Sequence, residues 1–205
     1  MSSAYTVLWA KEFRDEVCRA GDEGKPLTVL FGGAHQSCPS LARAGVTSGD
    51  IVFPVFVQNG LLHIIAAAVA KEFIGIEAYL REHLRLETAG VPEHQIRETI
   101  ETKLGSLGHR MRYVCGAEVL LVERSSPIRF DMLVPPEKLE EVLFCPRKGP
   151  QAGLNHIESG KLKSAISLQG NVRRMCPQTA RLFSELTGLD RTYETNRICT
   201  EGAVG

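Results

Sequence analysis

The chain has 205 residues, 43% of them hydrophobic, with 24 basic residues balancing 24 acidic ones. Such a chain can bury the core of one domain, which excludes extensive disorder, and its zero net charge excludes a uniformly basic nucleic-acid binder. Its apolar runs are shorter than the roughly 18 residues that a membrane-spanning helix needs, and its first residues lack the pattern of a secretory signal. We therefore expect a cytoplasmic protein without a membrane partner.

The predicted elements are short strands and helices without a repeated β-α-β unit. Apolar residues at helical spacing mark the helices, and short runs rich in β-branched residues mark the strands. Asn59-Gly60, between two apolar runs, is the strongest hairpin signal, and Pro54 predicts an edge strand or a bulge. In chain order we predict a helix over 9–19, strands over 27–31, 51–58 and 61–73, helices over 76–86 and 92–104, strands over 113–123 and 127–130, and helices over 136–144 and 177–186.

This order of elements predicts an α+β fold, with a small mixed β-barrel and flanking helices. No GxGxxG motif follows a strand, so a doubly wound dinucleotide-binding fold is not expected. We expect residues 1–130 to form the barrel domain, with a helical insertion near 76–110. Residues 131–205 are expected to form a C-terminal extension packed on the barrel.

The cysteines give no sign of a metal site. None form a Cys-x-x-Cys pair and no His-x-x-x-His spacing stands beside them, so neither a metal nor another cofactor is expected. In a cytoplasmic protein they are expected to be reduced thiols, several of them buried. The six are Cys18, Cys38, Cys115, Cys145, Cys176 and Cys199.

Three motifs carry a family resemblance. Gly24-Lys25-x-x-Thr28 follows a helix and opens a strand, Ser48-Gly49-Asp50 leads into an apolar strand, and the return strand at 64–73 runs directly into a helix. This arrangement resembles the PUA-like superfamily of ASCH, EVE and YTH domains, over about residues 5–130. An arginine of the ASCH pattern is absent, since Val29-Leu30-Phe31 stands in its place. The resemblance implies a barrel whose cleft holds RNA, modified DNA or a modified base.

Some ASCH-like proteins are small amidohydrolases, so the resemblance also implies an alternative activity. In that hypothesis the carboxylate of Glu118 acts as a general base on water, and Lys25 and Thr28 complete the catalytic group.

The stretch GGAHQSC at 32–38 has two interpretations. Cys38 could act as a nucleophile with His35 as its base, but no third, orienting residue is identifiable. Alternatively, the stretch is a connector at the rim of a cleft, where backbone N–H groups and short polar side chains meet a ligand. Its candidate ligand-binding residues are Gly32, Gly33, His35, Gln36 and Ser37.

The segment 145–174 is basic, with six Lys or Arg residues against one Glu. Such a surface can contact phosphates. Alternatively, it pairs with the acidic segment 72–101, either within one chain or between the chains of a homodimer. The candidate ligand-binding residues here are Arg147, Lys148, His156, Lys161, Lys163, Asn171, Arg173 and Arg174.

Trp9, the only tryptophan, either stacks on a base in the cleft or packs in the core. The leading hypothesis is a protein that binds RNA, DNA or a modified nucleotide in a barrel-side cleft. The alternatives are a small hydrolase acting on a modified nucleoside and a self-associating interaction protein.

Overall fold

The computed structural model describes residues 2–9, 11–35, 38–83, 85, 90–92, 95, 118–146, 149–166, 168 and 172–189. At positions 11–13, 16, 20, 34, 35 and 38 it describes the backbone alone. Most of the helix expected over 92–104 lies outside the described residues. So do five candidate site residues, namely Gln36, Ser37, Arg147, Lys148 and Asn171.

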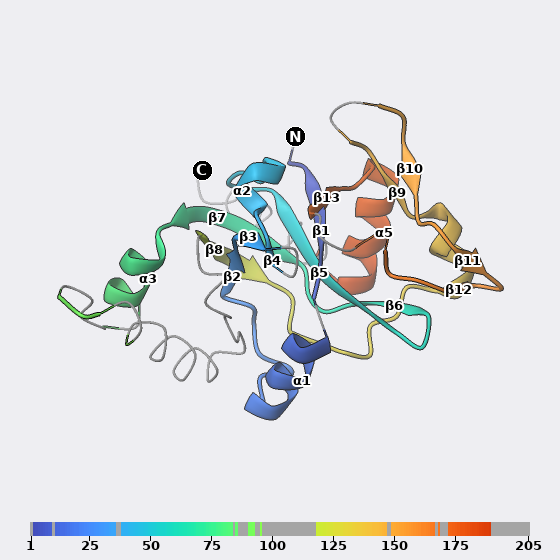
Figure 1. Ribbon diagram of the computed structural model, residues 1–205. Coiled ribbons are helices and arrows are strands. Elements are labelled where there is room, and N and C mark those ends of the chain that lie inside the picture. The colour runs from blue at the N-terminus through green and yellow to red at the C-terminus, as the bar shows by residue number, and fades with distance from the viewer. Residues whose placement is uncertain are drawn as a thin grey trace, which may run out of the picture.

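A curved, seven-stranded mixed sheet forms the centre of the fold (Figure 1). Its order is β13-β1-β5-β7-β8-β2, with β6 pairing to β5 beside this path. β1 and β5 run parallel, and the other neighbours run antiparallel. The predicted α+β class is confirmed. The strands are β1 (Ala4–Leu8), β2 (Val29–Gly32), β5 (Ile51–Gln58), β6 (Leu61–Ile64), β7 (Ala68–Ile74), β8 (Glu118–Ser125) and β13 (Val172–Arg174).

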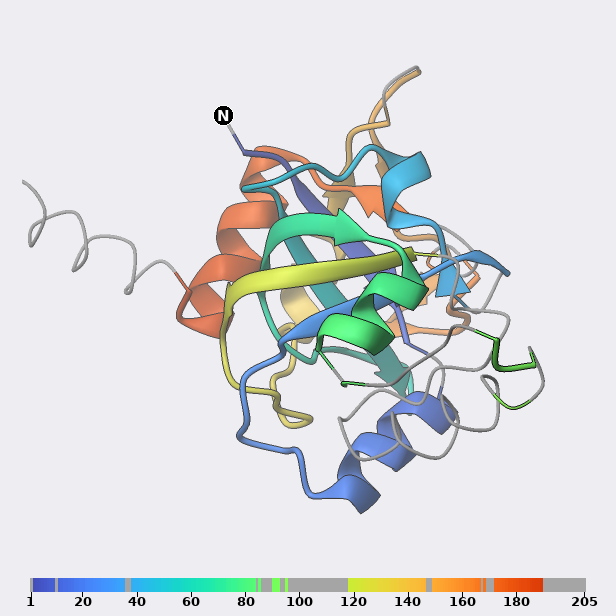
Figure 2. The same ribbon diagram turned by 90° about the vertical axis from the view of Figure 1, so that its left-hand side faces the viewer.

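Helices and small hairpins surround this sheet. α5 lies along the face of β1 and β5, α1 covers one end of the curve, and α3 stands beyond the ends of β7 and β8 (Figures 1 and 2). No helix in the described parts of the chain has the length and apolarity to cross a bilayer. The described helices are α1 (Lys11–Ala20), α2 (Leu41–Ala44), α3 (Ile76–Glu82), the 3-10 helix η3 (Pro136–Glu141) and α5 (Pro177–Thr187), and the hairpin strands are β3 (Ala34–His35), β4 (Cys38–Pro39), β9 (Leu143–Phe144), β10 (Ala152–Gly153), β11 (Ile157–Glu158) and β12 (Lys161–Leu162).

β5 is buried on both faces, which explains its continuous run of apolar residues. Val52 and Phe56 belong to an inner core enclosed by the curve of the sheet. Phe53 and Val55 belong to an outer core under α5, where the Phe53 ring meets the edge of Phe183 at a centroid distance of 5.5 Å. A strand buried on both faces shows no polar alternation, so this run could not reveal which residues face inward.

Pro54 lies in the middle of the sheet and not at its edge. β5 pairs with β7 before this residue and with β6 after it, so the missing N–H falls where the strand changes partner. The Pro54 carbonyl accepts a hydrogen bond from the Ile65 N–H at 2.8 Å. For the same reason the single strand predicted over 61–73 is two strands, since residues 65–67 carry the chain from β6 to β7.

Residues beyond 130 contribute to the sheet and to the outer core. β13 pairs antiparallel with β1, while Phe144 and Phe183 are fully enclosed in the outer core. The C-terminal part is therefore more closely built into the barrel than an extension packed on its surface. Two predicted elements here are shorter than expected, because the strand at 127–130 is a single bridge at Pro127 and the helix at 136–144 ends before β9.

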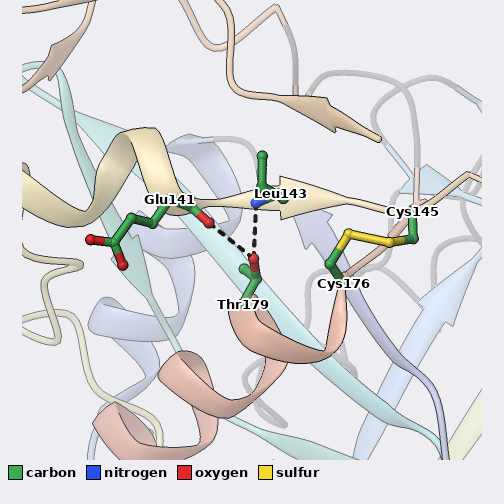
Figure 3. The surroundings of a disulfide bond; sticks show 5 residues. All are labelled: Glu141, Leu143, Cys145, Cys176 and Thr179. Atoms are coloured by element: carbon green, nitrogen blue, oxygen red, sulfur yellow. Dashed lines mark hydrogen bonds between the residues drawn. A yellow bond between two sulfur atoms is a disulfide. The ribbon is translucent and has the colours of Figure 1, made fainter. Parts of the chain in front are cut away.

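Cys145 and Cys176 form a disulfide with a Cα–Cα distance of 5.1 Å (Figure 3). The expectation that all six cysteines are reduced thiols is wrong for this pair. Backbone hydrogen bonds bring the two residues within disulfide range, because the Cys176 N–H donates to the Leu143 carbonyl at 3.0 Å and the Cys145 N–H donates to the Arg174 carbonyl at 2.9 Å. Their separation of 31 residues gives no local sequence signal.

The Ser48-Gly49-Asp50 motif joins the starts of three strands. Asp50 is 5% exposed, and its carboxylate accepts hydrogen bonds from the Ser3 N–H at 2.7 Å and from the Thr47 N–H and hydroxyl at 2.9 and 3.0 Å. Gly49 has a φ of +82°, and its N–H donates to Ala70 at 2.8 Å. The motif is therefore structural, since it fastens β1 and β7 to the start of β5.

Replacing Asp50 with Asn should lower the free energy of unfolding by about 2–4 kcal/mol. The two carboxylate oxygens each accept hydrogen bonds, one from Ser3 and the other from Thr47. In asparagine one of these oxygens becomes an NH2 group, which cannot accept, so the N–H or O–H groups facing it lose their partner. Chemical denaturation measures the change. Asp131→Asn is the matched control, since the Asp131 side chain is 66% exposed in its ion pair with Arg129 and its loss should cost less than about 1 kcal/mol. Equal effects of the two variants would contradict the role of Asp50.

Candidate functional site

The described residues of the segment 32–45, which are 32–35 and 38–45, lie between the two outer strands of the sheet, β2 and β13. The segment leaves the end of β2, forms the β3–β4 hairpin and continues as α2, which packs beside β13 at the opposite edge. The Tyr5 hydroxyl donates to the Gly45 carbonyl at 3.0 Å, which joins the end of α2 to β1. We call this segment the seam, because it connects the two edges that the sheet leaves open.

Glu118 fastens the seam. Its carboxylate accepts a hydrogen bond from the Ser40 hydroxyl at 2.9 Å, one from the Leu41 N–H, and a longer one from the Ala42 N–H at 3.3 Å. The Ser40 hydroxyl in turn caps α2 by accepting from the Arg43 N–H at 2.9 Å. Glu118 therefore satisfies the free N–H groups at the start of α2, a position where a carboxylate is stabilising.

Gly32 provides the space for this carboxylate. It lies directly opposite Glu118 in the β2–β8 pair, and a Cβ atom here would lie 2.8 Å from Cγ and 2.9 Å from Cδ of Glu118. Both Gly32 and Gly33 are buried. The glycine pair, predicted to present N–H groups to a ligand, thus has a structural explanation at Gly32, where a larger residue would displace Glu118.

The structure does not bring together the three residues of the hydrolase hypothesis. The Lys25 amine forms an ion pair with Asp22 at 2.6 Å. Thr28 pairs with Val122, whose N–H donates to the Thr28 carbonyl at 3.0 Å. Glu118 is four positions from Val122 along β8, which is roughly 13 Å at the rise of a strand. Glu118 and the Lys25–Thr28 motif therefore lie at opposite ends of the β2–β8 pair, too far apart to act on one reacting group.

His35 and Cys38 face each other across the β3–β4 hairpin as backbone partners. Their side chains are among those that the structure does not describe, so the proposed thiol–imidazole pair stays a prediction. Trp9 is half-buried against the inner core, and its backbone N–H donates to Val55 at 2.8 Å. This position favours the packing role of Trp9 over stacking on a base.

Two arginines lie side by side on β13 and project from opposite faces of the sheet. Arg174 is paired with Tyr5 and Arg173 with Thr6, and directly paired residues share a face. Arg174 is exposed and its Nη2 donates to the Ser3 hydroxyl at 3.0 Å. Arg174 is therefore exposed at this edge of the sheet, whereas Arg173 leaves the opposite face and is only partly exposed.

Arg173 is half-buried, and its guanidinium lies 4.1 Å from the centroid of the Phe144 ring. Burial lowers the pKa of Arg173 from its usual value, but a guanidinium is so basic that it remains charged at neutral pH. Contact with an aromatic face stabilises such a charge. Phe144 thus fixes the direction of the Arg173 side chain.

A third arginine, Arg43, is exposed on α2 beside β13. Within the described part of the chain, neither Arg43 nor Arg174 forms an ion pair with a carboxylate. We call Arg43, Arg173 and Arg174 the arginine edge. Arg43 lies about 130 residues before the other two in the sequence, so no local pattern connects them. The group becomes visible only because α2 packs against β13.

The other described residues of the basic segment lie elsewhere. Lys161, Lys163 and His156 belong to the β11–β12 hairpin, which attaches to the β5–β6 turn through the Leu162 N–H and the Gly60 carbonyl at 2.8 Å. Figure 1 shows this hairpin well apart from β13. The surface predicted as one basic segment is therefore divided into two groups.

His63 belongs to an aromatic cluster that the sequence did not reveal. Its ring stacks on Phe56 at 4.5 Å, with the Arg14 guanidinium 5.3 Å from the same Phe56 ring. Burial first, and then the charge of Arg14, lower the pKa of His63, while the Phe130 backbone and Asp131 oppose this shift. No group of three or more His, Cys, Asp or Glu side chains is placed to hold a metal ion among the described residues.

No protein-family profile and no curated protein sequence matches this chain. Its fold is similar to that of the ASCH protein from Zymomonas mobilis. One variant of that protein is 15% identical with a TM-score of 0.33, over 81% of this chain and 96% of that one. A second variant is 13% identical with a TM-score of 0.34, over 81% and 98%. The likeness concerns the fold, so function has to be argued from the residues of this chain.

Replacing Gly32 with Ala should lower the free energy of unfolding by about 1–3 kcal/mol, because Glu118 can avoid the new methyl group only by leaving Ser40 and α2. Thermal and chemical denaturation measure the loss. Gly153→Ala is the matched strand control, since its Cβ would meet Leu143 at an ordinary 3.7 Å. In a Glu118→Ala background the Gly32→Ala cost should shrink; a cost as large as in the wild type would contradict the clash.

Acidification should destabilise the protein through His63. Its folded pKa is lowered below the usual 6.5, so the stability that depends on the neutral ring is complete above pH 6.5 and is lost as the pH falls towards the folded pKa. Unfolding free energies between pH 8 and pH 5 should fall less steeply in His63→Gln than in the wild type. His156 is exposed, so the control variant His156→Asn should show the same dependence of unfolding free energy on pH as the wild type. If the wild type and both variants gave identical curves, His63 would not be the cause of the loss of stability in acid.

Proposed function

We propose that this protein binds nucleic acid through its phosphate backbone, at the arginine edge. The observation that carries the proposal is the position of Arg43, Arg173 and Arg174 on two neighbouring elements, α2 and β13, at one edge of the sheet. Guanidinium groups suit this task because they remain charged and can bind phosphate oxygens in a bidentate manner. A local group of this kind is compatible with the zero net charge of the whole chain.

The arginine edge is supported from beneath. The Phe144 ring lies under Arg173, the Ser3 hydroxyl receives Arg174, and the seam holds α2 with Arg43 in place. Side chains that are already oriented lose less conformational entropy when they bind a ligand. This support favours a binding surface over three unrelated solvated arginines.

Among the described residues, no carboxylate forms an ion pair with Arg43 or Arg174. Glu118 is engaged by Ser40 and the start of α2, and Asp50 is engaged by Ser3 and Thr47.

The surface favours contacts with phosphates over stacking on bases. Ile166 is the one large hydrophobic residue that is highly exposed among the described residues, so they present no widely exposed aromatic ring. Phosphate contacts carry little sequence information, whereas stacking and base-edge contacts select nucleotides. We therefore expect binding that depends strongly on salt and weakly on sequence.

Charge reversal at Arg174 or Arg43 should weaken binding to mixed-sequence RNA and DNA oligonucleotides by on the order of tenfold, since each variant removes a phosphate contact and adds repulsion. Fluorescence anisotropy across a salt series measures this, and the slope of log affinity against log salt should fall by about one per lost contact. The variants are Arg174→Glu and Arg43→Glu.

The matched control is Arg81→Glu, an exposed arginine on α3 in an ion pair with Glu82. It should leave the affinity unchanged. If all three variants bind as the wild type does, the arginine edge is not the interface. If Arg174→Glu instead changes the mass measured by light scattering without changing affinity, the edge serves self-association.

A further inference from the structure

The Cys145–Cys176 disulfide lies directly against the arginine edge. Cys176 follows Arg174 by two residues, and the Cys145 N–H donates to the Arg174 carbonyl at 2.9 Å. Cys145 is also the neighbour of Phe144, the residue whose ring supports Arg173. One covalent bond therefore joins the end of the strand that carries two of the arginines to the strand that supports them.

Hydrogen bonds hold the same junction independently of the disulfide. The Leu143 N–H donates to the Thr179 hydroxyl at 2.8 Å, and that hydroxyl donates to the Glu141 carbonyl at 3.3 Å (Figure 3). The Cys176 N–H adds its bond to the Leu143 carbonyl at 3.0 Å. These contacts join β9 to the first turn of α5, so the fold has a way to persist when the disulfide is open.

We infer that the Cys145–Cys176 disulfide is a redox switch that controls nucleic-acid binding at the arginine edge. This inference rests on the proposed function, because it concerns the regulation of that same surface. In the oxidised state the disulfide fixes the end of β13 and the start of the β9–β10 loop. In the reduced state the hydrogen bonds remain, but Arg173 and Arg174 lose the covalent brace that orients them.

The reaction is a thiol–disulfide exchange with a dithiol reductant. A thiolate of the dithiol attacks the sulfur of Cys145, the more exposed residue of the pair, since Cys176 is 4% exposed. The Cys145–Cys176 bond breaks, and the Cys176 sulfur leaves as a thiolate that takes up a proton. The second thiol of the reductant then displaces Cys145 from the mixed disulfide. The protein gains two electrons and two protons, and the dithiol becomes a disulfide.

Oxidised protein should bind about three- to tenfold more tightly than reduced protein. Ordering one or two long side chains on binding accounts for a difference of this size, because the disulfide has already restricted them. The salt dependence should remain in both states, since the same guanidinium groups make the contacts.

The test measures affinity for a fluorescent mixed-sequence oligonucleotide before and after treatment with dithiothreitol, at fixed salt. Both forms carry Cys18→Ser, because Cys18 is a free, exposed thiol that could exchange with the pair. Alkylation followed by mass spectrometry of the peptides with Cys145 and Cys176 verifies each redox state. The double variant Cys145→Ser with Cys176→Ser should bind as weakly as reduced protein and be insensitive to the reductant.

The outcomes separate the switch from the proposed function. Equal, salt-sensitive affinity in the oxidised and reduced forms would reject the switch and leave the binding function intact. Absence of binding in both forms would reject the binding function, and the switch with it. Circular dichroism completes the test: a reduced form that has lost its native spectrum would show that the disulfide maintains the fold, and this would also overturn the proposal.

Discussion

The carboxylate of Glu118 closes the molecule where the curved sheet leaves its two edges apart. β2 and β13 do not pair, and the described residues of the seam, which form a short hairpin and a four-residue helix, link β2 to the neighbourhood of β13. A helix of that length has no stability of its own. Its first N–H groups are satisfied by Glu118 from β8, and Gly32 leaves room for that side chain. Gly32, Ser40 and Glu118 thus have one common structural role, which is to hold the start of α2.

Local signals predicted the elements well where neighbouring residues decide the structure. The Asn59-Gly60 hairpin, the Gly49-Asp50 entry into β5 and the last helix, ended by Gly188 in the left-handed conformation, follow from turn and capping chemistry. The α+β class followed from their order. Pro54 was misplaced at an edge, because no local pattern shows that β5 changes partner at this residue.

The candidate site was harder to predict because it depends on contacts between distant residues. β13 joins β1 across more than 160 positions, and Arg43 reaches the arginine edge only through the packing of α2. The basic residues of the segment 145–174 are close in sequence but separate in space. Lys161 and Lys163 lie with the β11–β12 hairpin, which is hydrogen-bonded to the β5–β6 turn and not to β13. Glu118, interpreted as a general base, is instead a hydrogen-bond acceptor for a helix start. A carboxylate in an apolar strand suggested a reactive group, but the pairing of Glu118 with Gly32 places it beside the start of α2.

The arginine edge combines two kinds of support with different physical properties. On the α2 side, Arg43 depends on hydrogen bonds that Glu118 and Ser40 make within the seam. On the β13 side, both arginines lie close to the disulfide, Arg173 rests on the Phe144 ring and Arg174 donates to the Ser3 hydroxyl. Hydrogen bonds of the first kind do not respond to thiols, whereas the disulfide does. A change of redox state therefore acts on two of the three arginines and leaves Arg43 and the barrel closure in place, which is the condition for altering affinity without unfolding the protein.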